Sequence, residues 1–394
     1  MLKRFMQDFS KQAAMQGLLV AIVGYASSVA IVVQGVKAMG ATTEQIASCL
    51  LLLGIAKGVV AIGLSLWTRM PISIAWTTPG VALLAVTPLV AGGFPAAVGA
   101  FIVVGMLIVV AALWSPLARL ITKIPKAIAN AMLAGIIFKL CLAPFLALKQ
   151  APLVGTAILL TWVIMLKINR LYAVPAAVVV AIAATILGGD FAAGASFVVP
   201  QPVFTMPVFT FEAMISLAVP LFIVTMASQN ITGLAVLATF DFKPNPRAGL
   251  LVTGVVSVLT APFGAPAINY AAITAALCAG PDAHADPSRR YVSAVVAGFG
   301  YIALAGLAGV VTALVVYSSS LLIEAVAGLA LIGAFASATA GALQVEEDRI
   351  PAMATLLVTV SGVSFFSIGP AFWGLVIGCS LAAFFRWNPR IKLG

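Results

Sequence analysis

The chain has 394 residues, of which 63% are hydrophobic and 8% are charged, and its mean hydropathy is +1.17. This composition excludes a soluble globular protein and a disordered chain, and it indicates a helical protein that crosses a membrane many times. The net charge of +10 does not indicate nucleic-acid binding, because most basic residues lie in short loops on one side of the predicted membrane. The four cysteines lie singly in apolar runs without metal or redox spacing, so we expect no metal site and no cofactor.

The apolar runs predict an all-α polytopic membrane protein with about fourteen transmembrane segments. A longer extracytoplasmic linker at 190–211, which carries glycine, proline and aromatic residues, separates two sets of seven segments. The first set covers 16–37, 44–67, 71–88, 94–114, 125–142, 151–168 and 172–189, and the second covers 212–238, 247–262, 266–280, 290–316, 319–343, 350–366 and 369–387.

The positions of lysine and arginine predict the orientation. With the N-terminus inside, all but four of the 21 basic residues fall in cytoplasmic loops and ends. The exceptions are Lys37 and Lys149 in outer loops, and Lys57 and Lys139 within spans. Cytoplasmic loops of membrane proteins carry such an excess of positive charge, so we expect both termini in the cytoplasm.

The two halves of the sequence repeat. Short motifs recur in the same order, as in Gly58-Val-Val-Ala-Ile and Gly254-Val-Val-Ser-Val, or in the stretches that begin at Pro71 and Pro266, 195 positions apart. Seven spans per repeat make the second half enter from the opposite face. We therefore predict an inverted repeat of 1–189 and 212–394, which is typical of secondary transporters.

Segments three and ten do not read as continuous helices. In segment three, 71–77 is β-branched, aromatic and alternating, which predicts a short strand, and Thr78-Pro79 predicts an N-cap followed by a half-helix. Segment ten repeats the pattern, with its half-helix expected to begin near Asn269. Both half-helices should begin near mid-membrane and face each other, and two helix N-termini form a site for an anion.

Several residues of these segments are candidates for substrate binding. Trp76 and Tyr270 hold equivalent places in the two segments and would give a planar ligand a face to lie on. Thr77, Thr78 and Asn269 have side chains that hydrogen-bond a carboxylate. The alternative is that these are packed interfacial residues and that the prolines merely kink helices.

Segments one and eight should pack beside the crossing point of the two half-helices. They contribute Ser27, Gln229 and Asn230 as further candidates. Amides are costly in lipid unless they face the interior of the bundle. The alternative role for them is hydrogen bonding between helices.

At this point the sequence resembles a known family. The runs Asn230-Ile-Thr-Gly-Leu-Ala-Val-Leu, Ala261-Pro-Phe-Gly-Ala-Pro-Ala-Ile-Asn-Tyr and Ala283-His-Ala-Asp-Pro resemble the benzoate:proton symporter (BenE) family of bacterial inner membranes. That family is similar in fold to uracil/xanthine permeases and sulfate-type anion transporters. The resemblance implies a core domain of 16–114 plus 212–316, a gate domain of 115–189 plus 317–387, and a homodimer through the gate domain.

Proton coupling needs a titratable group that senses the substrate. The candidates are Glu324 in segment twelve and Lys57 in segment two, and the alternative is that the substrate enters with its own proton. The single histidine, His284, lies between Asp282 and Asp286 in a loop, where a turn with solvated charges is the simplest interpretation.

The sequence thus predicts an inner-membrane secondary transporter that imports a small aromatic carboxylate, most directly benzoate, with protons. "Benzoate" comes from the resemblance, whereas the paired half-helix ends indicate only a small anion. The alternatives are a nucleobase or other small-anion permease and, in a different class, a passive anion channel. We expect no enzyme, because no nucleophile–base pair or cluster of carboxylates lies within the spans.

Overall fold

The computed structural model describes residues 2–114, 116, 124–187, 199–317, 320–363, 365 and 368–386. Residues 190–198 of the predicted linker, and 115 and 117–123 at the start of the predicted gate domain, lie outside these ranges.

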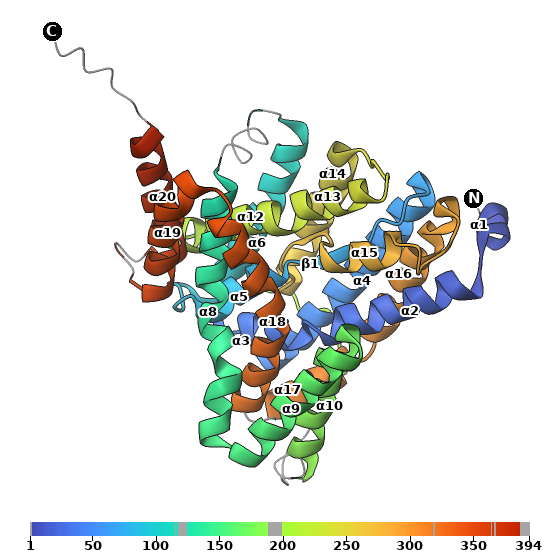
Figure 1. Ribbon diagram of the computed structural model, residues 1–394, viewed down its shortest axis with the longest axis horizontal. Helices are drawn as coiled ribbons and strands as arrows, with labels where there is room; N and C mark the ends of the chain where they lie inside the picture. Colours follow the sequence, from blue (N-terminus) through green and yellow to red (C-terminus); the bar gives the residue numbers. More distant parts are fainter. Residues whose placement is uncertain are drawn as a thin grey trace.

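The described chain is almost entirely helical (Figure 1). The first half contains α1 (Leu2–Asp8), α2 (Lys11–Ala26), α3 (Val29–Ala38), α4 (Thr43–Thr68), α5 (Thr78–Val86), α6 (Gly93–Leu113), α8 (Lys126–Gln150), α9 (Pro152–Ile168) and α10 (Arg170–Leu187). The second half contains α11 (Phe211–Ala213), α12 (Val219–Val224), α13 (Ile231–Thr239), α14 (Pro246–Thr260), α15 (Ile273–Ala279), α16 (Tyr291–Ala305), α17 (Ala308–Tyr317), α18 (Ser320–Leu343), α19 (Arg349–Ser361) and α20 (Pro370–Arg386). Two π-helical stretches, Met214–Ala218 and Thr225–Asn230, join α11, α12 and α13 into one continuous helical segment, Phe211–Thr239.

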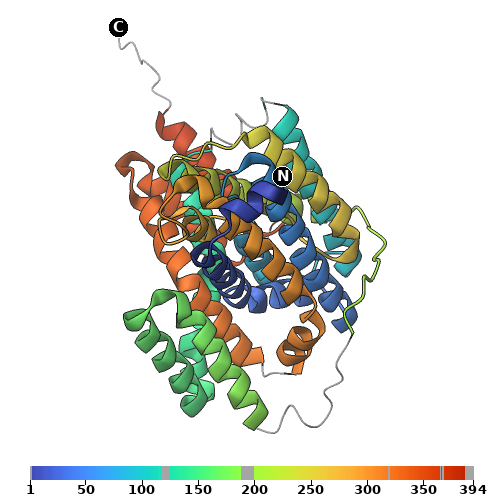
Figure 2. The same ribbon diagram turned by 90° about the vertical axis from the view of Figure 1, so that its right-hand side faces the viewer.

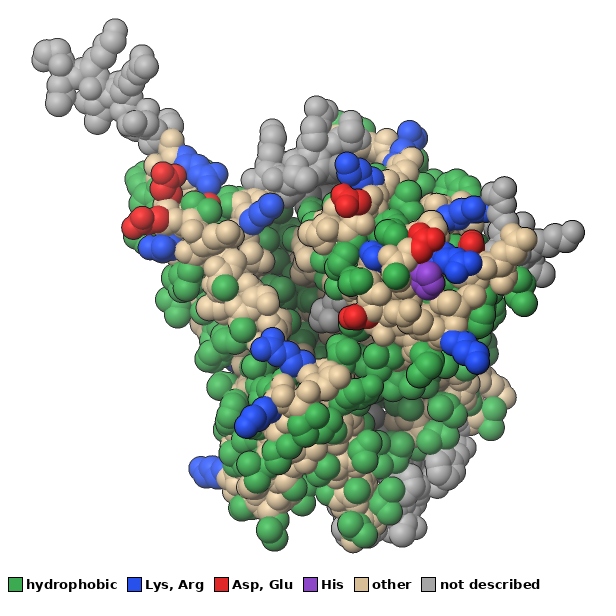
Figure 3. All heavy atoms as spheres, turned by 45° about the vertical axis from the view of Figure 1, so that its right-hand side comes forward, with side chains coloured by type: hydrophobic (Ala, Val, Ile, Leu, Met, Phe, Trp, Pro, Cys, Tyr) green, Lys and Arg blue, Asp and Glu red, His purple; other side chains and the backbone are tan. Residues whose placement is uncertain are grey.

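Within the described residues, eight helices are long and apolar enough to cross a membrane, or nine if the bent pair Pro287–Ala305 and Ala308–Leu314 counts as one span. Figure 3 shows a largely hydrophobic surface across the middle of the molecule, with charged side chains mainly toward its upper end. The protein is therefore a polytopic helical membrane protein. Fourteen crossings, cytoplasmic termini and an inverted repeat stay predictions.

The helices pack most extensively within two sets. In one set, α16 packs against α2 and α4, and α14 packs against α6. In the other, α8 lies against α18 and α19, α19 lies against α20, and α9 lies against α10. The α9–α10 hairpin forms the lower edge of the molecule in both ribbon views (Figure 1 and Figure 2). The division into core and gate domains stays a prediction.

A two-stranded sheet lies at the centre of the helices. The strands β1 (Ile74–Trp76) and β2 (Ile268–Tyr270) pair antiparallel, with Ile74 opposite Tyr270 and Trp76 opposite Ile268. Helix side chains satisfy the outer edge of β2: Ser257 Oγ accepts from the N–H of Ile268, and Asn230 Oδ1 accepts from the N–H of Tyr270, both at 3.0 Å. Each half of the chain therefore supplies one strand. Side chains from neighbouring helices accept the two N–H groups on the outer edge of β2.

The helices that follow the strands begin one to four residues away from their predicted starts. The N-cap of α5 is Thr77 rather than Thr78, because the carbonyl of Thr77 accepts the N–H of Val81 at 2.9 Å. The start of α15 at Ile273 corrects the prediction of a start near Asn269, because Asn269 is held in β2 by its pairing with β1.

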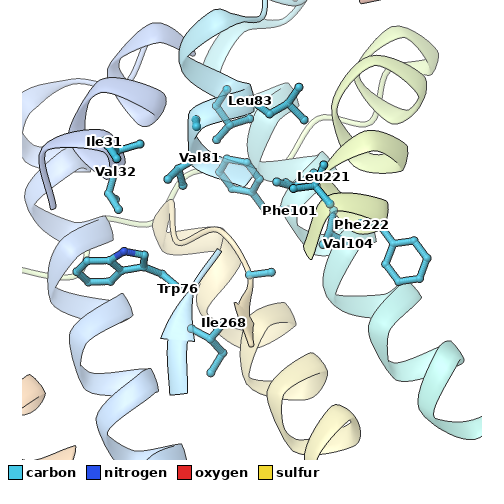
Figure 4. Packing of buried hydrophobic residues seen from close by; sticks show 14 of the residues in the cluster. Ile31, Val32, Trp76, Val81, Leu83, Phe101, Val104, Leu221, Phe222 and Ile268 are labelled. Carbon is cyan, nitrogen blue, oxygen red and sulfur yellow. The ribbon is translucent and has the colours of Figure 1, made fainter. Parts of the chain in front are cut away.

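The core around β1 is apolar and closely packed. Figure 4 shows Val81 of α5 near Ile31 of α3, and Phe101 of α6 near Leu221 of α12. A Cβ atom added to Gly80 would overlap Leu221 Cδ1 and lie 2.6 Å from Thr77 Oγ1. Only glycine lets α12 approach the first turn of α5 this closely.

Candidate functional site

A cavity of about 300 Å³ lies where α2, β1, α5 and the π-helical stretch Thr225–Asn230 meet α10 and α18. That volume lies at the lower end of the range for small-molecule sites. We call it the central cavity; its polar and aromatic lining residues are Ser27, Ser28, Lys57, Trp76, Thr78, Arg170, Gln229, Thr274 and Tyr301.

Four of the eight substrate-binding candidates line the central cavity, namely Ser27, Trp76, Thr78 and Gln229. The side-chain amide of Gln229 has no hydrogen-bond partner among the described residues, so it is free to meet a ligand. Lys57, one of the two candidates for proton coupling, lies in the same wall.

Three other candidates hold the strands in place instead of lining the cavity. Thr77 Oγ1 lies 2.7 Å from Thr225 Oγ1, and Asn230 binds the backbone of Tyr270. The Asn269 amide lies between the N–H of Thr77 at 3.0 Å and the carbonyl of Tyr270 at 2.9 Å, where its oxygen accepts and its nitrogen donates. The hydrogen bond of Asn230 fits the alternative interpretation, in which this side chain bonds to a neighbouring element instead of binding the substrate.

Tyr270 points away from the central cavity. Its ring lies against α14, where a Cβ atom added to Gly249 would overlap the phenol. Its hydroxyl is buried and has no hydrogen-bond partner among the described residues. Since Tyr270 stands opposite Ile74 in the sheet and Trp76 stands opposite Ile268, equivalent places in the repeat do not bring the two aromatic rings together.

Lys57 is the most unusual side chain of the cavity. It is only 1% exposed, and its ammonium lies 3.6 Å from the ring centroids of both Trp76 and Tyr301 and 5.6 Å from that of Tyr25. The indole of Trp76 is fixed because its Nε1–H donates to Ser28 Oγ at 2.9 Å. Aromatic faces attract cations, and the attraction is stronger where water is excluded.

No carboxylate neutralises Lys57. The ion pairs formed within the described residues join Asp8 to Arg289, Glu346 to Arg349, and Asp348 to Arg386, and none of them includes Lys57. Charged groups inside a membrane protein are rare and usually pair with something. The described surroundings of Lys57 are aromatic rings, and no ion pair among the described residues includes it.

The electrostatics of the central cavity favour an anion. Lys57 and Arg170 are its charged lining residues, and both are cations. Thr78 and Pro79 place the first turn of α5 at the wall, and N–H groups of a first turn have no partner within their helix. Sequence reasoning missed Arg170 because it counted this residue as a cytoplasmic loop charge.

Glu324 and His284 lie elsewhere. Glu324 is exposed on α18, in a different cavity that also contains Lys37 and Lys139.

His284 lies in a turn, where its Nδ1 accepts the N–H of Asp286 at 3.0 Å. Hydrogen bonds from the hydroxyl and N–H of Ser288 lower the pKa of Asp286. In the parts of the chain that the structure describes, no group of three or more His, Cys, Asp or Glu residues is placed to hold a metal ion.

The chain matches the family model described as BenE, benzoate membrane transport protein, over residues 7–384. It is 39% identical over 364 residues to the inner membrane protein YdcO of Escherichia coli (strain K12), which covers 92% of this chain and 93% of that protein. It is 32% identical over 391 residues to the benzoate membrane transport protein of Acinetobacter baylyi, which covers 99% of each.

Two solved structures share its fold. The transmembrane domain of a cyanobacterium bicarbonate transporter, BicA, aligns with a TM-score of 0.61 at 15% identity, over 94% of this chain and 97% of that one. The murine solute carrier 26 family member A9 anion transporter, in the inward-facing state, aligns with a TM-score of 0.54 at 10% identity, over 91% and 68%.

Because the family model and the Acinetobacter relative are membrane transport proteins, the chain is a membrane transport protein rather than an enzyme, and it has the fold of the two anion transporters and a cavity whose charged lining residues are both basic. Within that class, the chain belongs to the BenE family of benzoate membrane transport proteins. The apolar helices and the inner-membrane relative support a multi-pass protein of a bacterial inner membrane.

Proposed function

We propose that this protein is a secondary active transporter that imports a small aromatic carboxylate, most directly benzoate, together with a proton. The observation that carries the proposal is Lys57, a buried cation with aromatic neighbours and no described carboxylate partner, in the wall of the central cavity. Benzoate is proposed because the Acinetobacter relative carries that name.

The cavity has two unlike halves that suit such a substrate. Its core side offers Lys57, Gln229 and the first turn of α5 at Thr78 to a carboxylate. Its gate side carries Arg170 at the start of α10 and is otherwise apolar, with Val174 on α10 and Leu331 on α18 lining the same space. A benzoate anion would place its charge on the first side and its ring on the second. The proposal keeps the anion between segments three and ten, and it makes Lys57, instead of the second helix end, the main positive charge.

Lys57 also supplies a route to proton coupling. A carboxylate in the cavity and a proton on Lys57 stabilise each other, so binding of either favours binding of the other by the same factor. A lysine ammonium buried without an anion loses several kcal/mol of hydration, on the order of the effective penalty for a buried ion. A site that fills and empties with both charges together avoids that penalty in both states, which is the requirement for symport.

Transport would follow from movement of the core domain, 16–114 plus 212–316, against the gate domain, 115–189 plus 317–387. The central cavity is supported as the moving site because its lining comes from both: α2 and α5 on one side, α10 and α18 on the other. A homodimer through the gate domain would hold the gate still while the core moves. The domain movement and the homodimer are both part of the proposal.

The test is uptake into proteoliposomes with an imposed pH gradient. Labelled benzoate should accumulate above equilibrium when the inside is alkaline, and substituted benzoates should compete while uracil should not. Flux that only dissipates a gradient would identify a passive anion channel. Competition by uracil at least as strong as that by substituted benzoates would identify a nucleobase permease instead.

A further inference from the structure

Two more cavities lie along the same interface as the central cavity. The first, the apolar chamber, has a volume of about 170 Å³ and is lined by Tyr25, Val29, Val178, Leu322 and Val326 among others. The second, the outer cavity, has a volume of about 510 Å³ and contains Gln34, Lys37, Lys139 and Glu324.

The helices that form this interface show how the three cavities are arranged. Along α2 and α3, Val23, Gly24, Ser27 and Ser28 line the central cavity, Tyr25, Ala26, Val29 and Ala30 line the apolar chamber beside it, and Lys37 lines the outer cavity further along. Lys37 lies nine residues beyond Ser28, and nine residues of helix span about 14 Å. The outer cavity is thus displaced from the central cavity along the helix axis.

The gate helices agree with this displacement. On α18, Ala330 lines the central cavity, and further along the helix Leu322, Ile323 and Val326 line the apolar chamber while Ile323 and Glu324 line the outer cavity. On α10, Val174 lines the central cavity and Val178 the apolar chamber. The outer cavity is therefore displaced from the central cavity on both sides of the interface, and the apolar chamber adjoins both.

The outer cavity carries net positive charge. Its charged lining residues are two lysines, Lys37 on α3 and Lys139 on α8, and one carboxylate, Glu324. None of the ion pairs within the described part of the chain includes any of these three residues. The side-chain oxygen of Gln34 in the same cavity is buried without a hydrogen-bond partner among the described residues. Unpaired lysines in a concave site raise the local concentration of anions.

The apolar chamber adjoins both the outer cavity, with which it shares Ile323, and the central cavity. Its lining is aliphatic except for the ring of Tyr25. An anion finds no cation there and would lose its hydration without compensation. The chamber is therefore a barrier to charge in the conformation described, and passage between the two charged cavities requires the walls to move apart.

We propose that the outer cavity is a second binding site for the same monocarboxylate: the access site that collects the anion from outside the cell before it reaches the central cavity. The proposal rests on the proposed function, because it takes the substrate from there. It assigns Lys37 and Lys139 to capture, Glu324 to their partial neutralisation, and the apolar chamber to the closed barrier between the two sites.

The experiment measures uptake of labelled benzoate by intact cells, in which only the outer face meets the substrate. The double variant Lys37→Gln/Lys139→Gln is compared with Lys149→Gln, an exposed lysine near the end of α8 that does not line the cavity. Loss of steering charge should raise KM about tenfold and flatten its dependence on salt. The control variant should keep the wild-type KM. Benzoate affinity of the purified double variant in detergent should stay within about twofold of wild type, because the central cavity is intact.

A double variant with wild-type KM and wild-type salt dependence would overturn the proposal. So would a loss of affinity in detergent as large as the rise in KM, because the two lysines would then act on the central cavity or on the fold. Wild-type cells that accumulate no aromatic carboxylate at all would instead refute the proposed function, and the access site with it.

Discussion

Replacing Lys57 with methionine should weaken benzoate binding strongly while changing the stability of the protein little. The variant keeps the length and most of the volume of the side chain and removes the ammonium between Trp76 and Tyr301. Each of these two cation–ring contacts, at 3.6 Å, contributes up to about 2 kcal/mol where water is excluded. Against this stands the penalty of several kcal/mol for burying an ion. Where Lys57 is protonated the two terms nearly offset each other, and where the empty site has released the proton both terms are absent, so we expect the free energy of unfolding to change by less than about 2 kcal/mol.

The effect on binding should be much larger. Removing one partner of a buried charge pair costs about 2–5 kcal/mol. This range corresponds to a rise in the Kd for benzoate of about 30-fold to 4,000-fold. Isothermal titration calorimetry on detergent-purified protein measures the Kd, and thermal unfolding of the same samples measures stability. Lys149→Met serves as the exposed control. A Lys57→Met variant that binds benzoate within about threefold of wild type would refute the role of Lys57 as the counter-charge.

Further predictions concern four side chains. Tyr270→Phe should stabilise the protein by about 1 kcal/mol or more in thermal unfolding without changing the Kd, because it removes a buried hydroxyl that has no described partner; a weaker affinity would return this residue to the site. Asn230→Ala should lower the free energy of unfolding by about 1–3 kcal/mol, because it leaves the N–H of Tyr270 unpaired. Gln229→Ala should leave stability unchanged and raise the Kd about tenfold, a loss of about 1.4 kcal/mol, as measured by calorimetry. Glu324→Gln should keep pH-driven accumulation of benzoate; its collapse to the equilibrium level would make Glu324 the proton carrier instead of Lys57.

The positions of the helices could be predicted from the sequence because the apolar runs and the prolines mark them. The strand Ile74–Trp76 lies within the stretch for which an extended backbone is predicted, and Pro79 lies in the first turn of α5. These are local signals. A β-branched alternating run and a proline that fits a first turn act through their own backbone, whatever surrounds them.

The directions of the side chains could not be predicted in the same way. In a strand of three residues, a shift of one position moves every side chain to the other face. The register with β1 turns Tyr270 toward Gly249, and nothing in the sequence of either strand records that register. Lys57 could be identified as unusual from its apolar surroundings. Its aromatic neighbours Trp76 and Tyr301 belong to other elements, β1 and α16, so their contact with Lys57 becomes visible only in the structure.

The pairing of β1 with β2 has a consequence for how the protein is made. Trp76 and Ile268 are opposite each other in the sheet but 192 positions apart in the chain. At about 5–20 residues per second, roughly 10–40 s of synthesis separate them. During that time the backbone of β1 has no strand partner, and unpaired groups in hydrocarbon cost several kcal/mol each. The half of the chain that carries β1 therefore cannot complete its own fold, and a gene divided between the halves should yield stable protein only when both pieces are synthesised in the same membrane.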